Sequence, residues 1–301
     1  MTSATEIPAR PSSEARPVIA AAWMMGAVAS FTFMAVAGRA VSVELDTFEV
    51  LGWRSLMGVI VMALVITFSG LWKTVNLHRF DLHLSRNIFH FAAQNLWFYA
   101  IFTIPLAQVF ALEFTAPLWA LILSRAFLGE RLSTQRIVAA LLGFIGILLV
   151  TRPGSVPITP GLISAAACAI GFAMTYVFTK KLTMVAHTAS ILFWMTVLQA
   201  VFGFICAGID GDIALPSLAA APWVAVIGVT GLTAHFCITC ALRVAPATLV
   251  MPFDFLRLPV IALVGLLLFD EPVSLFLIAG AALILGGNYV NIRSAAAGRP
   301  S

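Results

Sequence analysis

The sequence has few charged residues, and this scarcity excludes most soluble architectures. Asp, Glu, Lys and Arg make up 10% of its 301 residues, whereas hydrophobic residues make up 61%. Soluble domains usually carry about 25% charged residues. A soluble enzyme of this composition would have more apolar surface than it could bury, and intrinsic disorder requires low hydrophobicity. Both classes are therefore excluded.

Cysteine and the common catalytic motifs are also scarce. The 4 Cys residues all lie in apolar runs, which excludes a disulfide scaffold. His235, Cys237 and Cys240 form an H-x-C-x-x-C pattern, but a zinc site needs four ligands and no second Cys/His pair is near. There is no G-x-x-x-x-G-K-[ST], G-x-S-x-G or H-E-x-x-H motif. We therefore expect no metal, no cofactor, no ATP-driven step and no enzymatic activity.

Long hydrophobic runs dominate what remains. Stretches of about 20 apolar residues are long enough to cross a bilayer as helices, and continuous rather than alternating apolarity excludes barrel strands. Ten such stretches are found, at 18–38, 47–69, 86–104, 107–128, 134–151, 160–179, 188–208, 220–242, 247–269 and 272–291. The sequence predicts an all-α integral membrane protein with ten transmembrane helices. We expect residues 1–17 to be a polar tail rather than a cleaved signal peptide.

The positions of the basic residues predict the orientation, since cytoplasmic loops hold the excess of Lys and Arg. All but four of the 17 Lys and Arg residues fall on the side that holds both termini. The exceptions are Arg39 and Arg152 on the other side, and Arg54 and Arg257 within the stretches. We expect a multi-pass protein of the cell inner membrane with both tails, 1–17 and 294–301, in the cytoplasm. The net charge of +4 is spread between apolar blocks, so no nucleic-acid partner is expected.

The two halves of the chain are weakly similar at an offset of 141 residues. The offset aligns Trp53 with Trp194, Pro105 with Pro246, Glu113 with Asp254, Glu130 with Glu271 and Arg152 with Arg293. The repeats cover 18–152 and 153–293 and hold five stretches each, so the second half enters the membrane from the opposite side. The cytoplasmic loop between the second and third stretches holds Lys73, Arg79 and Arg86, whereas its equivalent has no Lys or Arg and carries Asp210 and Asp212. Inverted repeats are typical of secondary transporters that alternate access to a midplane site.

A sequence motif occurs at matching positions in both halves. Residues Pro117 to Gly146 contain Gly129-Glu130-Arg131-Leu132-Ser133, and the second half contains Pro259 and then Phe269-Asp270-Glu271-Pro272-Val273-Ser274. These stretches resemble the EamA repeat of the drug/metabolite transporter superfamily. Known relatives move amino acids, nucleotide-type cofactors, riboflavin and sugar conjugates.

The resemblance implies a secondary transporter for a small organic metabolite, either a vitamin-like or cofactor-like ring compound such as riboflavin, or an amino acid. An amino-acid or drug exporter is the alternative, and a channel or a membrane-embedded enzyme is more remote. The expected partners are the small-molecule substrate and the lipid bilayer, with a proton as a candidate coupling ion. A monomer and a homodimer both remain open.

Several polar residues lie inside the predicted helices, where an ionisable group is costly and needs a partner. Arg54 and Glu113 each lie about seven residues, or roughly 10 Å, below the outer surface, so we expect them to pair. Asp254 and Arg257 have the i,i+3 spacing of one helix face. His235 and its repeat equivalent Gln94 complete the set of candidate substrate-binding or coupling residues. These groups bind a polar substrate and relay a proton, or they are fixed ion pairs that hold helices in register.

Aromatic residues are numerous, with 23 Phe, 7 Trp and 3 Tyr. Trp97, Tyr99 and Tyr176 are candidates to stack on a planar substrate, although lipid-facing bulk is the alternative. The expected cavity is lined by the first, third, fourth, sixth, eighth and ninth stretches. We expect Glu130 and Glu271 to cap the helices that follow them.

Overall fold

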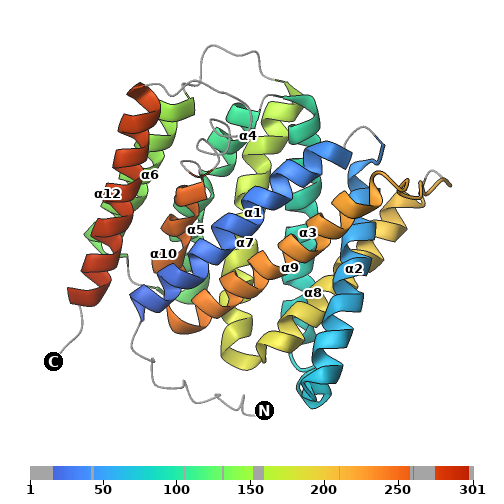
Figure 1. Ribbon diagram of the computed structural model, residues 1–301. Coiled ribbons are helices and arrows are strands. Elements are labelled where there is room, and N and C mark those ends of the chain that lie inside the picture. The colour runs from blue at the N-terminus through green and yellow to red at the C-terminus, as the bar shows by residue number, and fades with distance from the viewer. Residues whose placement is uncertain are drawn as a thin grey trace, which may run out of the picture.

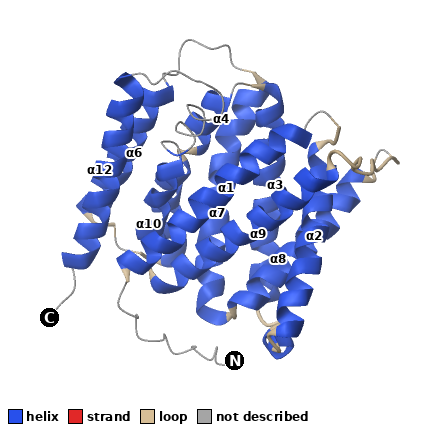
Figure 2. Cartoon of the chain, viewed as in Figure 1, coloured by secondary structure: helices blue, strands red, loops and turns tan. Residues whose placement is uncertain are grey.

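The computed structural model describes most of the chain, and the helices in that part form one bundle (Figure 2). The described residues are 16–41, 44–104, 106–130, 132–151, 159–209, 211–257, 260 and 275–297. Within these ranges the regular structure is entirely helical. The helices are α1 (Pro17–Val41), α2 (Thr47–Phe68), η1 (Leu71–Thr74), α3 (Phe80–Thr103), α4 (Leu106–Glu113), α5 (Ala116–Leu128), α6 (Thr134–Thr151), α7 (Pro160–Val185), α8 (Thr188–Ala207), α9 (Ala221–Val244), α10 (Ala247–Val250), η2 (Met251–Leu256) and α12 (Leu275–Ala297).

Five of the described helices are both long and apolar enough to cross a membrane: α1, α2, α7, α8 and α9. Helix α3 has 24 residues, but polar side chains along one face lower its hydropathy. It begins six residues before the predicted stretch 86–104, and this difference moves Arg86 from a loop into the helix. The all-helical, apolar class predicted from composition is therefore the one observed.

Two predicted stretches are interrupted rather than continuous. The stretch 107–128 is divided into α4 and α5 at Phe114 and Thr115, and α5 carries a proline in its first turn. A proline is tolerated there because the first N–H groups of a helix have no intrahelical partner. The stretch 247–269 begins as the short α10 and tightens into the 3-10 turn η2, which contains Pro252. Both breaks lie deep in the bundle, where they place polar groups beside a cavity.

Local signals explain where several helices begin and end. The Asp46 side chain accepts from the Glu49 N–H, and the Glu49 side chain accepts from the Asp46 N–H, which forms a capping box at the start of α2. His187, the repeat equivalent of Asp46, caps α8 by accepting from the Ala189 N–H. Gly129 ends α5 with a left-handed φ of 66°, a conformation that glycine adopts without strain.

Each half of the chain packs mainly on the other half. Helix α1 lies along α9, and helix α3 lies along α7. These two pairs are equivalent, because the repeat offset aligns α1 with α7 and α3 with α9. Helix α2 packs on its own repeat equivalent α8, and α6 packs on its equivalent α12. Figure 1 shows α1 beside α9 and α6 beside α12. The core is therefore built between the halves rather than within them.

Glycines allow the equivalent helices to approach closely and show that they are antiparallel. Gly52 near the start of α2 meets Gly203 near the end of α8, where a Cβ on Gly203 would lie 2.6 Å from the Gly52 Cα. Gly146 late in α6 meets Gly280 early in α12, where a Cβ on Gly146 would lie 2.6 Å from the Gly280 carbonyl oxygen. Small residues at such crossings are the usual means of tight packing between helices in a bilayer.

Two equivalent tryptophans tie the loops of one half to helices of the other. The Trp53 indole on α2 donates to the Ala214 carbonyl, in the loop that follows α8, at 2.9 Å. The Trp194 indole on α8 donates to the Asn76 carbonyl, in the loop that follows α2, also at 2.9 Å. The alignment of Trp53 with Trp194 thus corresponds to a shared structural role.

Candidate functional site

A cavity of about 40 Å³ lies between the two halves of the bundle. Its walls come from α1, α3, α7, α9, η2 and the break between α4 and α5, which correspond to the six stretches expected to line it. The lining residues are Phe31, Met34, Arg86, His90, Gln94, Trp97, Glu113, Ala116, Phe172, Thr175, Tyr176, Thr179, His235, Ile238, Asp254 and Arg257. This volume has room for only a few water molecules. Side chains must therefore move before a metabolite can enter.

One end of the cavity holds a buried cluster of charges, which we call the acidic end (Glu113, Asp254, Arg257 and Trp97). The Arg257 guanidinium donates to the Glu113 carboxylate and lies 3.3 Å from Asp254 Oδ2. The Trp97 indole donates to Glu113 Oε2 at 2.5 Å. All four side chains are buried. The contact between Arg257 and Glu113 joins the two halves of the chain at the two helix breaks.

Aromatic rings surround the guanidinium of Arg257. Its Cζ lies 4.9 Å from the ring centroid of Phe114, 5.2 Å from that of Phe31 and 5.8 Å from that of Phe110. The negative faces of such rings attract a cation that has been removed from water. These rings and the two carboxylates together compensate the charge of Arg257 inside an apolar bundle.

The expected ion pair between Arg54 and Glu113 is wrong. Arg54 donates instead to the side-chain oxygen of Gln94, and Glu113 pairs with Arg257. Depth along a helix, on which the expectation rested, does not determine which way a side chain points around the helix axis. The expected contact between Asp254 and Arg257 is confirmed at 3.3 Å.

The opposite end of the cavity, which we call the basic end (Arg86, His90, His235 and Thr179), was largely missed from the sequence. Arg86 Nε donates to Thr179 Oγ1 at 3.2 Å, and Arg86 Nη2 lies 3.4 Å from His235 Nδ1. The rings of His90 and His235 meet edge to face, with centroids 4.5 Å apart. Of this group only His235 was predicted.

A signal for the basic end was nevertheless present in the sequence. His83, Arg86, His90, Gln94 and Trp97 recur every three or four residues, which places them on one face of a helix. The structure buries all five on α3. Arg86 was placed in a cytoplasmic loop because the stretch 86–104 was defined by apolar residues alone, and polar residues on a buried face are invisible to that criterion.

The aromatic candidates fall into two groups. Trp97 and Tyr176 line the cavity, whereas Tyr99 is 43% exposed on the outer surface of α3. Residues two apart on a helix point in nearly opposite directions, which separates Trp97 from Tyr99. Tyr99 is therefore not a cavity residue, and Phe31 and Phe172 contribute rings that were not predicted.

The described contacts of Glu130 cap a helix of the other half of the chain rather than the next helix that we expected. Its carboxylate accepts from the N–H groups of Ala247 and Thr248, each at 3.1 Å, and from Thr248 Oγ1 at 2.7 Å. It therefore caps α10 in the opposite half, because the folded chain brings the end of α5 to the start of α10. The expected cap by Glu271 lies outside the described residues, as do Pro105, Asp210, Pro259 and the stretch 269–274.

Comparison with known proteins agrees with the two-repeat organisation. A sequence model of the EamA-like transporter family matches residues 18–152 and 159–293. The chain belongs to the EamA-like transporter family. It is thus a multi-pass membrane protein whose relatives carry small molecules.

Three relatives illustrate the range of this EamA family. A riboflavin transporter of Brucella anthropi is 31% identical over 241 residues, covering 77% of this chain and 85% of the relative. A riboflavin transporter of Vibrio cholerae is 28% identical, covering 89% and 91%. An S-adenosylmethionine uptake transporter of Rickettsia bellii is 25% identical, covering 87% and 89%. A solved crystal structure with 18% identity and a TM-score of 0.78 has the same fold over 92% of this chain and 98% of its own.

Proposed function

We propose that this protein is a secondary transporter, not an enzyme, that moves a cofactor-like ring compound across the cell membrane by alternating access. The observation that carries the proposal is the contact between Glu113 and Arg257. It joins the two halves beside a cavity to which both halves contribute. A central site at the interface of two repeats is the arrangement in which rocking of one repeat against the other exposes the site to each side in turn.

The proposed topology is ten membrane crossings in two inverted five-helix repeats. The antiparallel packing of α2 on α8 and of α6 on α12 supports the inversion, since these pairs are repeat equivalents. In this topology α4 with α5 makes one crossing, and α10 with η2 begins another. Residues at both breaks line the cavity, and irregular backbone within a membrane is tolerated beside a cavity.

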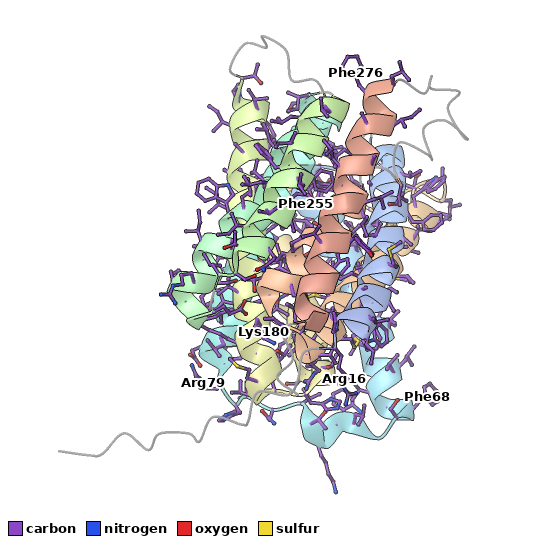
Figure 3. All side chains as sticks on the ribbon, turned by 90° about the vertical axis from the view of Figure 1, so that its left-hand side faces the viewer. Arg16, Phe68, Arg79, Lys180, Phe255 and Phe276 are labelled. Carbon is purple, nitrogen blue, oxygen red and sulfur yellow. The ribbon has the colours of Figure 1, made fainter. Side chains whose placement is uncertain are left out.

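The proposed orientation places both termini in the cytoplasm of a cell with an inner membrane. The labelled basic residues Arg16, Arg79 and Lys180 lie toward the same end of the bundle in Figure 3, and α1 begins and α12 ends there as well (Figure 1). An excess of Lys and Arg marks the cytoplasmic side of a membrane protein.

The proposed cargo class follows from the walls of the cavity. Phe31, Trp97, Phe172 and Tyr176 offer flat apolar faces, and the charged residues lie at the two ends. Such rings stack on a planar ring system. The relatives named for riboflavin and S-adenosylmethionine carry compounds of this kind, which favours a cofactor-like cargo over a free amino acid or a metal ion.

The proposed mechanism uses Glu113 and Asp254 as the groups that change partners during the cycle. Both carboxylates share Arg257 in the described conformation. When the cargo enters, it separates Arg257 from one carboxylate, and that carboxylate binds either a cargo donor or a proton. Proton coupling of this kind uses buried acidic groups in many transporters.

The test is flux into proteoliposomes that contain the purified protein. Radiolabelled riboflavin and S-adenosylmethionine are the probes, and Glu113→Gln and Asp254→Asn are compared with wild type. We expect each variant to reduce uptake at least about tenfold, the effect of losing one charge-assisted contact. Arg79→Gln, on an exposed loop, serves as the control and should retain wild-type flux. Unchanged uptake in both carboxylate variants would remove these residues from the mechanism.

A further inference from the structure

The buried charges at the two ends of the cavity are not equally balanced by opposite charges. At the acidic end one guanidinium, that of Arg257, faces two carboxylates. Arg86 at the basic end and the neighbouring Arg54 are 1% and 6% exposed, and neither forms an ion pair with any residue in the part of the chain that the structure describes. A buried charge without a counter-charge is costly, so these two arginines favour an anion from outside the chain.

The Arg86 guanidinium also has donors to spare. A guanidinium carries five N–H donors, and Arg86 directs one each toward Thr179 Oγ1, Asn87 Oδ1 and His235 Nδ1. All three partners are neutral acceptors. Two donors therefore remain on a residue that lines the cavity, which suits the paired oxygens of a carboxylate or a phosphate.

The two histidines beside Arg86 add unpartnered nitrogens. Both ring nitrogens of His90 and Nε2 of His235 are buried and have no hydrogen-bond partner among the described residues. His90 is 1% exposed and His235 6%, and both line the same cavity. Because a guanidinium can only donate, the 3.4 Å contact between Arg86 Nη2 and His235 Nδ1 favours the tautomer of His235 that carries its proton on Nε2. That nitrogen is thus a free donor next to the guanidinium.

Two of the three protein partners of Arg86, Thr179 and Asn87, have hydrogen bonds that do not depend on it. The Thr179 hydroxyl still donates to the Thr175 carbonyl at 2.7 Å, and Asn87 Oδ1 still accepts from Gln199 Nε2 at 3.1 Å. Removal of Arg86 would leave these groups paired and would remove a charge from the interior of the bundle. A purely structural role for Arg86 is therefore poorly supported by its surroundings.

The residues of α3 that line the cavity run from Arg86 at the basic end to Trp97 at the acidic end. Arg86 and Trp97 are eleven residues apart on this helix, which corresponds to about 16 Å. His90 and Gln94 lie between them on the same face and also line the cavity. A cargo that spans this length would meet cationic groups at one end and the Glu113 carboxylate at the other.

We propose that Arg86, with His235 Nε2 beside it, is a binding subsite for a carboxylate or phosphate group of the cargo. The cargo is then a ring compound that carries an anionic group, and not a neutral ring compound. This inference rests on the proposed transport function and narrows its substrate class.

The test compares probes that differ only in the anionic group. S-adenosylmethionine is paired with its decarboxylated form, and riboflavin 5′-phosphate is paired with riboflavin. In proteoliposomes we expect the anionic member of at least one pair to be taken up about tenfold or more better than its partner. Arg86→Met should abolish this preference, and Arg86→Lys should restore part of it. Arg79→Gln is the control and should leave the preference unchanged.

A second measurement tests whether the Arg86→Met variant is folded. The melting temperature of detergent-purified Arg86→Met should equal or exceed that of wild type. Equal uptake of both members of each pair by wild type, or a preference that survives in folded Arg86→Met, would overturn the subsite while transport itself stood.

If wild type moves none of the four probes, the proposed cargo class fails. Binding of inorganic phosphate, measured as an increase in melting temperature, then tests the subsite alone. An equal increase in wild type and Arg86→Met would overturn it.

Discussion

The guanidinium of Arg257 and the carboxylate of Glu113 form an ion pair between residues 144 positions apart in the chain. Arg257 directly follows the turn η2 and Glu113 ends α4, so both residues lie within the interrupted stretches 247–269 and 107–128. The pair is closed on one side by the Trp97 indole and on the other by the ring of Phe114. This contact between the two halves is therefore made where two helices are interrupted.

Breaking this pair from one side should cost stability. We expect Glu113→Gln to lower the free energy of unfolding by about 2 kcal/mol, because the charge-assisted hydrogen bond between Arg257 and Glu113 is lost while Asp254 remains as the counter-charge of Arg257. The double variant Glu113→Gln/Arg257→Gln should lose less than the sum of the two single losses, because Arg257→Gln alone leaves two buried carboxylates without a counter-charge and the double variant leaves only Asp254. Thermal unfolding of the four proteins in one detergent gives the coupling energy. Additive effects of the two substitutions would contradict the pairing.

A side chain at the close crossing of α2 on α8 should destabilise the protein. Gly203→Ala places a methyl group 2.6 Å from the Gly52 Cα, which forces the helices apart, so we expect a loss of about 1–3 kcal/mol. Gly286→Ala is the matched control on α12, because a Cβ there meets nothing within 4 Å. The control should be neutral or more stable by about 1 kcal/mol, the helix preference of Ala over Gly. Melting temperatures of the two variants check the difference.

The hydrogen bonds by which Glu130 caps α10 should contribute to the stability of the protein. Glu130 accepts three hydrogen bonds at the start of that helix, so we expect Glu130→Ala to destabilise the protein by about 1–2 kcal/mol. Glu130→Gln keeps an acceptor oxygen and should lose less. Thermal unfolding distinguishes the two, and an equal loss in both would indicate that charge at the helix end, rather than hydrogen bonding, is the important term.

The inverted topology predicts the sides on which two loops lie. Lys73 follows α2, and Leu218 precedes α9 and is 96% exposed. In a background where the four native cysteines are replaced by serine, Lys73→Cys should react with a membrane-impermeant maleimide only from the cytoplasmic face. Leu218→Cys should react only from the outer face. Labelling of both from the same face of intact cells and inverted vesicles would refute inversion.

The two equivalent tryptophans should contribute similar amounts to stability. Trp53→Phe and Trp194→Phe each remove one hydrogen bond to a loop carbonyl and keep most of the ring. We expect each to cost about 1 kcal/mol. A large effect at one position and none at the other, in thermal unfolding, would show that the repeat relationship does not extend to these loops.

Much of the architecture was predictable from residue type, because crossing a bilayer requires long apolar helices whatever packs against them. The repeat offset likewise identified Trp53 and Trp194, whose matching bonds appear only in the fold. Pairing inside the bundle was not predictable to the same degree. Arg54 and Glu113 lie at similar depth, but Gln94 lies on the side toward which Arg54 points. Hydropathy also hid Arg86 and His90, because a buried polar face lowers the average that defines a membrane span.

The packing of each half on the other has a consequence for the synthesis and membrane insertion of the chain. Glu113 enters the membrane with the first half, but Arg257 is synthesised 144 residues later. At ribosomal rates of about 5–20 residues per second, that interval is roughly seven to thirty seconds. During this time Glu113 lacks the guanidinium of Arg257, with which it pairs in the folded protein. The free-energy cost of that unpaired carboxylate in the membrane is lower if Glu113 binds a proton until the last helices are inserted.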